Sequence, residues 1–230
     1  MRGSTTSAKY KPVVQVSSSN NDAKLCRIVV LISGNGSNLQ AIIDHCANGS
    51  IPAEVVAVIS NVKSAFGLVR AQKVGITTHC LDHRHFASRS AFDAALGVLV
   101  DRFHPDLVVL AGFMRILSPS FIDRFVGRLL NIHPSLLPRY PGLDTHQRAI
   151  ADGAKEHGAS VHFVTRDLDA GPVIIQSRLG VLEQDSAKTL AARVHKIEHR
   201  IYPKAVGWFA SRRLALKDGV VLLDGKPLNH

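Results

Sequence analysis

The sequence of 230 residues has few cysteines and lacks any long apolar run. Its three cysteines, Cys26, Cys46 and Cys80, form an odd and widely spaced set that gives no disulfide framework. We therefore expect a reducing compartment and predict a cytoplasmic protein. No uninterrupted apolar segment approaches the ~20 residues that span a bilayer, so we expect no role in a membrane.

Acidic residues are scarce beside basic ones, 18 against 28, and the formal net charge is +10. A positive charge suits nucleic acid and small polyanionic substrates alike. The basic residues are scattered, with no long Lys/Arg run and no interleaved aromatic residues. Small-molecule substrates are therefore favoured over nucleic acid. The alternative to an enzyme is a non-catalytic nucleotide- or RNA-binding module. A tRNA gel shift at moderate salt would detect RNA binding by such a module.

The N-terminus lacks acidic residues altogether as far as Asn21, and it shows neither a helical nor a strand period. We predict that residues 1–24 form a tail outside the fold and that residues 25–230 form one domain. The tail has no apolar signal core. It could be native, a targeting segment or an expression remnant, and the sequence leaves these alternatives open.

Apolar runs alternate with amphipathic segments through the rest of the chain. Strands are expected at 27–32, 54–60, 76–81, 106–110, 128–132, 159–164 and 173–182, and helices at 39–46, 65–74, 89–103, 120–125, 145–152 and 187–206. This alternation predicts a single-domain α/β fold, in which a mostly parallel twisted sheet carries helices on both faces. Asp218-Gly219 lies between two apolar runs and predicts a β-hairpin over 214–223.

A glycine-rich loop, Ser33-Gly34-Asn35-Gly36-Ser37-Asn38, follows the first apolar run and precedes a helix. Small residues let a phosphate approach the backbone, and a helix N-terminus offers unpaired N–H groups. Leu39 stands where a dinucleotide fingerprint requires a third glycine, so a nicotinamide site is not expected. The alternative is a plain strand–helix turn with Ser37 as N-cap.

The stretch from Asn131 to Gly142 carries three prolines, which prevent a helix or an inner strand from continuing. Asn131 and His133 stand two residues apart and share one face if the strand continues that far. A carboxamide can polarise a carbonyl and an imidazole can transfer a proton near neutral pH. The alternative is a rigid structural loop whose histidine has no chemical role.

Two histidine-rich segments invite a metal hypothesis, which we do not favour. The segment from His79 to His85 contains three histidines and a cysteine but is more typical of a solvated loop. His195-Lys196-Ile197-Glu198-His199 matches the H-x-x-E-H pattern of inverted zinc proteases. The third ligand of that pattern, a later Glu, is absent because no Glu follows Glu198.

Three motifs in this order, SGNGSN, AGFMRIL with NIHPSLLPRYPG, and HFVTRDLDAGPVI, resemble those of the glycinamide ribonucleotide (phosphoribosylglycinamide) formyltransferases. The resemblance extends from Arg27 to Leu223. NIHPSLLP by itself marks the wider group of formyltetrahydrofolate-using enzymes, and the fold implied is Rossmann-like. One departure is visible at Asp144, where histidine is more common in the family, while His146 is retained.

The resemblance implies transfer of the formyl group from 10-formyltetrahydrofolate to the amine of 5′-phosphoribosylglycinamide, in de novo purine biosynthesis. The implied catalytic triad is Asn131, His133 and Asp169. Asn131 and protonated His133 would stabilise the oxyanion that forms when the amine attacks. Asp169 would favour the protonated imidazole and could position a proton-relaying water.

The resemblance also implies a phosphate-binding N-terminal half and a folate-binding C-terminal half. The ribonucleotide would be held by Gly36, Ser37, Asn38 and Glu198. The residues implied for folate are Arg89, Met114, Arg115, Ile116, Leu117, Asn131, Thr165, Arg166, Asp167, Leu168 and Asp169. Formyltetrahydrofolate would be a cosubstrate that leaves as tetrahydrofolate, and no metal is needed.

Two relatives remain as alternatives within this group. A methionyl-tRNA formyltransferase would suit the positive charge but would require a further C-terminal domain. A formyltetrahydrofolate deformylase would place a regulatory domain before the core, whereas few residues precede the first expected strand here. The sequence leaves open whether the chain acts as a monomer or as a homodimer.

Overall fold

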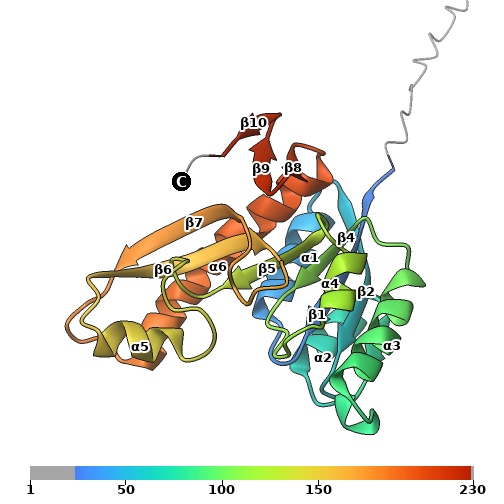
Figure 1. The fold of residues 1–230 in the computed structure, drawn as a ribbon, viewed down its shortest axis with the longest axis horizontal. Coiled ribbons are helices and arrows are strands. Elements are labelled where there is room, and N and C mark those ends of the chain that lie inside the picture. Colours follow the sequence, from blue (N-terminus) through green and yellow to red (C-terminus); the bar gives the residue numbers. More distant parts are fainter. Residues whose placement is uncertain (1–23, 229–230) are drawn as a thin grey trace, which may run out of the picture.

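A seven-stranded sheet forms the centre of the computed structural model, which describes residues 24–228 (Figure 1). The predicted tail, residues 1–24, therefore lies almost wholly outside the described residues. In the order β3-β2-β1-β4-β5-β6-β7, the first five strands are parallel, and β6 and β7 run antiparallel to their neighbours. The strands are β1 (Cys26–Ile32), β2 (Ala53–Ser60), β3 (Thr78–Cys80), β4 (Leu107–Leu110), β5 (Leu129–His133), β6 (Glu156–Phe163) and β7 (Val173–Gly180). The predicted mostly parallel sheet is confirmed.

Helices cover both faces of the sheet, as the alternating pattern predicted. In β1, Ile28 and Val30 pack on one face with α1 and α6, whereas Val29 and Leu31 pack on the other with α3 and α4. Successive side chains of a strand point to opposite faces, so a continuous apolar run supplies both cores. The helices are α1 (Ser37–Ala47), α2 (Phe66–Lys73), α3 (Arg89–Asp101), α4 (Pro119–Arg124), α5 (Thr145–Ala151) and α6 (Ala187–Ala210), with a short 3₁₀ turn, η1 (His83–His85).

Helix α6 is longer than the sequence pattern predicts and continues past Pro203 to Ala210. A proline inside a helix removes one backbone hydrogen bond, and tertiary packing offsets that cost here. Pro203 is buried, and the neighbouring Tyr202 hydroxyl donates to the Leu110 and Leu130 carbonyls at 2.9 and 3.1 Å. Helix α6 is thereby fixed beneath β4 and β5.

The C-terminus forms a small antiparallel sheet beside the end of α6 (Figure 1). The predicted hairpin is confirmed as β8 (Leu214–Lys217) and β9 (Val220–Leu223). Its turn residues Asp218 and Gly219 have φ of 50° and 78°, the positive values that a tight hairpin turn requires. A third strand, β10 (Lys226–Pro227), was not predicted, because two residues carry no periodicity.

Candidate active site

His133 and Asp169, 36 positions apart in sequence, lie side by side in the fold. His133 Nδ1 is 3.4 Å from Asp169 Oδ2, and the two side chains are only 6% and 8% exposed. His133 is the last residue of β5, whereas Asp169 belongs to the connection between β6 and β7, which folds back over the end of β5. The residues form an ion pair when the imidazole is protonated, and burial limits screening of that pair by water.

The other ring nitrogen of His133 is committed to the loop that follows β5. His133 Nε2 donates to the Tyr140 carbonyl at 2.8 Å, so Nδ1 is the nitrogen that faces Asp169. The Gly142 N–H in turn donates to Asp169 Oδ2 at 2.8 Å. Tyr140 has a φ of 55°, and these two bonds hold this turn in place. The rotation of the imidazole is therefore fixed by backbone groups of its own loop.

Asn131 is oriented by a histidine that the sequence reasoning did not single out. Its amide nitrogen lies 3.1 Å from His162 Nε2, and His162 Nδ1 donates to the Phe163 carbonyl at 2.9 Å. With Nδ1 as the donor, Nε2 must accept from the Asn131 amide. Burial lowers the pKa of His162, which keeps the ring neutral and preserves this acceptor. The second N–H of the Asn131 amide remains for a ligand.

The glycine-rich loop has the backbone arrangement of an anion site at the start of α1. Gly36 has a φ of 74°, and a Cβ there would lie 2.7 Å from the Gly67 Cα, so only glycine fits. Gly36 is also the N-cap of α1, and no side chain caps the helix. The alternative of Ser37 as N-cap is therefore wrong. The first intrahelical bond joins Gln40 N–H to the Gly36 carbonyl, which leaves the preceding N–H groups available to an anion.

Asn38 and Glu198, both predicted for the ribonucleotide, meet although 160 positions separate them. Asn38 Nδ2 donates to Glu198 Oε2 at 2.8 Å. Glu198 lies on α6 and is 3% exposed, so its carboxylate is desolvated beside the end of the glycine-rich loop. Asn38 Oδ1 is buried and has no hydrogen-bond partner within the described part of the chain. A buried polar atom of this kind is expected to pair with a ligand.

The predicted folate residues of the loop after β4 divide into exposed and buried ones. Met114 and Ile116 are 69% and 56% exposed, and Leu168 of the connection between β6 and β7 is 54% exposed. Large apolar side chains left in solvent are typical of an interaction or ligand-binding surface. Leu117 differs, since its side chain is buried in the core beneath α3 and only its main chain can contact a ligand.

The polar residues predicted to bind folate differ in how free their side chains are to contact a ligand. The Arg166 guanidinium forms two hydrogen bonds with Asp123 of α4, at 2.9 and 2.7 Å, and this pairing keeps the pKa of Asp123 below its usual range. Arg115 lies over the Phe92 ring at 4.8 Å, and its Nε is buried without a partner among residues 24–228. Arg89 begins α3 and is exposed. The remaining two, Thr165 and Asp167, belong to the connection between β6 and β7.

The three side chains of the zinc-protease pattern on α6 do not point toward one common centre. Glu198 turns toward Asn38, and the His195 and His199 rings stack 6.4 Å apart instead of pointing at a common centre. Between Lys24 and Leu228, no group of three or more His, Cys, Asp or Glu side chains is arranged to hold a metal ion. The H-x-x-E-H match on α6 therefore does not form the ligand set of an inverted zinc protease.

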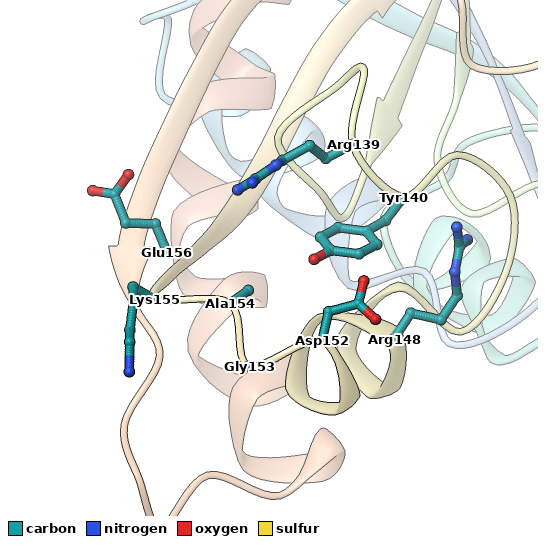
Figure 2. A pocket seen from close by; sticks show the side chains of 8 residues that line it. All are labelled: Arg139, Tyr140, Arg148, Asp152, Gly153, Ala154, Lys155 and Glu156. Atoms are coloured by element: carbon teal, nitrogen blue, oxygen red, sulfur yellow. The ribbon is translucent and has the colours of Figure 1, made fainter.

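A pocket of about 680 Å³ lies against the outer side of the loop after β5 (Figure 2). Its wall includes Tyr140 and Arg148, and the Arg148 guanidinium lies 5.5 Å from the Tyr140 ring centroid. Arg148 also donates to the Pro141 and Leu143 carbonyls at 2.6 and 3.3 Å. The stacking and these bonds support, from outside, the same turn whose Tyr140 carbonyl holds His133.

The sequence did not predict a role for three groups of this site: His162, the Tyr140 carbonyl and the Gly142 N–H. His162 lies in a segment whose alternation predicted a strand, but alternation gives no partner. Asn131 stands opposite His162 only because β5 and β6 pair antiparallel in that register. A backbone carbonyl or N–H has no residue type to signal it, so only the folded loop reveals the other two groups.

Comparison with known proteins identifies relatives along nearly the whole chain. Residues 26–206 match the formyl transferase family. The phosphoribosylglycinamide formyltransferase of Escherichia coli (strain K12) is 56% identical over 201 residues, which cover 87% of this chain and 95% of that protein. The trifunctional purine biosynthetic protein adenosine-3 of Homo sapiens is 43% identical over 195 residues, or 85% of this chain and 19% of that protein.

Among solved structures, the phosphoribosylglycinamide formyltransferase of Coxiella burnetii superposes with a TM-score of 0.86 at 53% sequence identity. The alignment covers 90% of this chain and 97% of that one. The same arrangement of sheet and helices is therefore present in a protein of known structure.

Proposed function

The chain belongs to the formyl transferase family, and on that premise we propose that Asn131, His133 and Asp169 carry out formyl transfer within it. The chain is an enzyme that formylates phosphoribosylglycinamide in purine biosynthesis. The donor is a folate-type formyl carrier, and we assign it as 10-formyltetrahydrofolate. It is consumed in the reaction, so it is a substrate, and the products are N-formylglycinamide ribonucleotide and tetrahydrofolate.

Asn131 and His133 act on the formyl oxygen. When the glycinamide amine attacks the formyl carbon, negative charge develops on that oxygen and must be stabilised. Asn131 has one amide N–H committed to His162 and the other remaining for the oxyanion. His133 in its protonated form places a positive charge beside that oxygen, with Nε2 bonded to the Tyr140 carbonyl and Nδ1 facing Asp169. A donor and a positive charge fixed in advance cost little reorganisation at the moment of reaction.

Asp169 supports the positive charge on His133 and handles the proton of the attacking amine. Its carboxylate is 3.4 Å from His133 Nδ1, close enough to attract a positive charge on that ring. The attacking amine becomes positively charged and must lose a proton, while the departing folate nitrogen must gain one. A carboxylate and an imidazolium in contact can accept the first proton and supply the second, directly or through one water.

The two substrates occupy opposite sides of this triad. The phosphate of the ribonucleotide binds the backbone N–H groups at the start of α1, around Gly36, Ser37 and Asn38. The buried Glu198 carboxylate receives a sugar hydroxyl or the substrate amine beside Asn38. The folate lies on the side of the loop after β4, where Met114 and Ile116 enclose the pterin. These assignments place the amine and the formyl group on either side of Asn131 and His133.

One observation carries this proposal: three polar side chains from two distant segments meet in a site where His133 and Asp169 are nearly buried. A buried imidazole in contact with a carboxylate, beside an oriented carboxamide, is an arrangement suited to acid–base chemistry. Three unpaired cysteine thiols among the described residues suit the reducing cytoplasm, where we place the enzyme.

The test is a formyl-transfer assay with glycinamide ribonucleotide and 10-formyltetrahydrofolate together and with each alone. We expect product only when both are present. Release of formate from the donor alone would instead identify a deformylase and contradict the proposal.

Activity should also survive dialysis against a strong chelator, because the transfer from an activated amide needs no Lewis acid. A loss of activity that zinc restores would contradict the assignment of the chemistry to this triad.

A further inference from the structure

Arg70 of α2 contacts the glycine-rich loop, although neither the sequence motifs nor the proposed function assigns it a role. Its Nε donates to the Asn35 carbonyl at 2.9 Å, and its Nη2 donates to Asn35 Oδ1 at 3.0 Å. Its Nη1 lies 3.4 Å from Gln40 Oε1, in the first turn of α1. One guanidinium therefore joins the middle of the loop to the helix that follows it.

The start of α2 is fixed against the loop, which holds Arg70 at this contact. The Gly67 N–H donates to the Gly34 carbonyl at 3.1 Å, and a Cβ on Gly67 would overlap the Ile32 side chain. Arg70 lies one helical turn after Gly67, and its guanidinium stacks over the Phe66 ring at 4.9 Å. The close approach of backbones and the stacking leave the guanidinium little freedom to turn elsewhere.

The bond to the Asn35 carbonyl also sets the direction of the next backbone N–H. The peptide bond between Asn35 and Gly36 is trans, and in a planar trans peptide the C=O and the N–H point in opposite directions. Because the Asn35 carbonyl points at Arg70, the Gly36 N–H points away from it. This N–H has no acceptor among the residues that the structure describes. It is one of the groups that we assign to the phosphate.

Arg70 also brings a positive charge that no carboxylate offsets. Within residues 24–228, all of its hydrogen bonds go to neutral oxygen atoms of Asn35 and Gln40. The side chain is half-buried, so water screens the charge only in part. The N-terminal end of α1 carries a partial positive charge as well. Both charges favour an anion at the loop.

We propose that Arg70 is a positioning residue for the phosphate of the acceptor substrate. The inference rests on the proposed function, which places that phosphate at Gly36, Ser37 and Asn38. Arg70 acts through Asn35, whose carbonyl it holds so that the Gly36 N–H faces the phosphate. Its charge attracts the anion from the opposite side of the same peptide. The contribution of Arg70 therefore depends on the phosphate, and not on the amine or the formyl donor.

The experiment compares two acceptors, glycinamide ribonucleotide and the glycinamide riboside that lacks the phosphate. Arg70→Gln should lower kcat/KM for the ribonucleotide about tenfold, through KM, because it removes a charged donor from the loop. The riboside kcat/KM and the donor KM should stay within about twofold of wild type, because neither involves the phosphate. A partly unfolded variant would lose activity toward both acceptors equally. The ratio of the two kcat/KM values therefore reports on the phosphate and not on folding.

Two further variants separate the contact from a general effect of charge. Lys73→Gln makes the same change of net charge on the same helix, at a side chain that does not contact the loop, and should keep the wild-type ratio. Arg70→Lys keeps the charge but cannot bond both oxygen atoms of Asn35 in the same forked geometry. It should lower the ratio by about threefold, less than Arg70→Gln.

Three results would overturn the role of Arg70: a wild-type ratio in Arg70→Gln, an equal fall of the ratio in Lys73→Gln, or an equal loss toward both acceptors. Formyl transfer to the ribonucleotide by the wild-type chain is measured first. Its absence refutes the proposed function, and the role of Arg70 falls with it. Normal transfer with an unchanged ratio in Arg70→Gln refutes the role of Arg70 alone.

Discussion

The contact between His133 and Asp169 can be tested by removing one charge while keeping the loop intact. Asp169→Asn is suited to this, because the carboxamide oxygen can still accept the Gly142 N–H bond that Asp169 Oδ2 accepts at 2.8 Å. The matched control is Asp123→Asn. It makes the same chemical change and removes the exposed 2.7 Å ion pair with Arg166, which belongs to the same connection as Asp169.

The expected size of the effect follows from distance and burial. Two unit charges 3.4 Å apart attract by about 5 kcal/mol at an effective dielectric constant of about 20. Part of that attraction is already present before the reaction, and only the gain in the transition state accelerates it. We therefore expect Asp169→Asn to lose about 3 kcal/mol of transition-state stabilisation. This corresponds to a kcat lower by about two orders of magnitude.

Steady-state kinetics with both substrates varied is the assay. We expect kcat to fall in Asp169→Asn while the two KM values change much less, because the lost interaction forms mainly in the transition state. Asp123→Asn should keep kcat within about twofold, as an exposed ion pair contributes little. His133→Ala should reduce kcat about as much as Asp169→Asn.

The double variant decides whether the two residues act as one unit. If they do, His133→Ala combined with Asp169→Asn should be little worse than either change alone. Effects that multiply would show that the residues act independently, and the pairing would then be wrong. An equal loss of kcat in Asp123→Asn would show that the loop, and not the charge on Asp169, matters.

Three further predictions concern other parts of the site. Ser37→Asp puts a negative charge at the start of α1 and should raise the ribonucleotide KM at least about tenfold with little change in the donor KM, whereas Ser37→Ala should leave both near wild type. His162→Phe removes the acceptor that orients Asn131 and should lower kcat by about tenfold, while an unchanged kcat would show that Asn131 needs no such partner. Burial lowers the pKa of His146 to about 4 from 6.5, so the folded state resists its protonation, and the free energy of unfolding should fall as pH drops from about 6.5 toward about 4. Urea denaturation at several pH values should show a shallower loss for His146→Gln, and an identical slope would contradict the assignment to this group.

The sequence by itself determined the elements and their order. The continuous apolar run of β1 and the alternation of strands with helices were sufficient to predict a mostly parallel sheet covered on both faces. It also pointed to Asn131 and His133, because a rigid proline-rich loop directly follows them. These features are local, since side-chain period, proline and glycine act within a few residues.

The pairing of distant segments came from the tertiary structure. His162 lies opposite Asn131 because of an antiparallel register between β5 and β6, and Asn38 meets Glu198 because α6 packs against α1. The same packing commits the Glu198 carboxylate to a hydrogen bond from Asn38, whereas the zinc pattern had grouped it with His195 and His199. Neither the register nor the packing leaves a local signal in the sequence.

At Gly36, the sequence and the tertiary structure each explain a different part of why the residue is glycine. The sequence indicated a tight strand–helix turn there, but the reason for glycine is a neighbour 31 positions away: the Gly67 backbone would lie 2.7 Å from any Cβ. Likewise, Asp169 reaches His133 from an antiparallel connection and not from the end of a parallel strand. Contacts of this kind depend on excluded volume and on how the layers pack, which are properties of the folded chain as a whole.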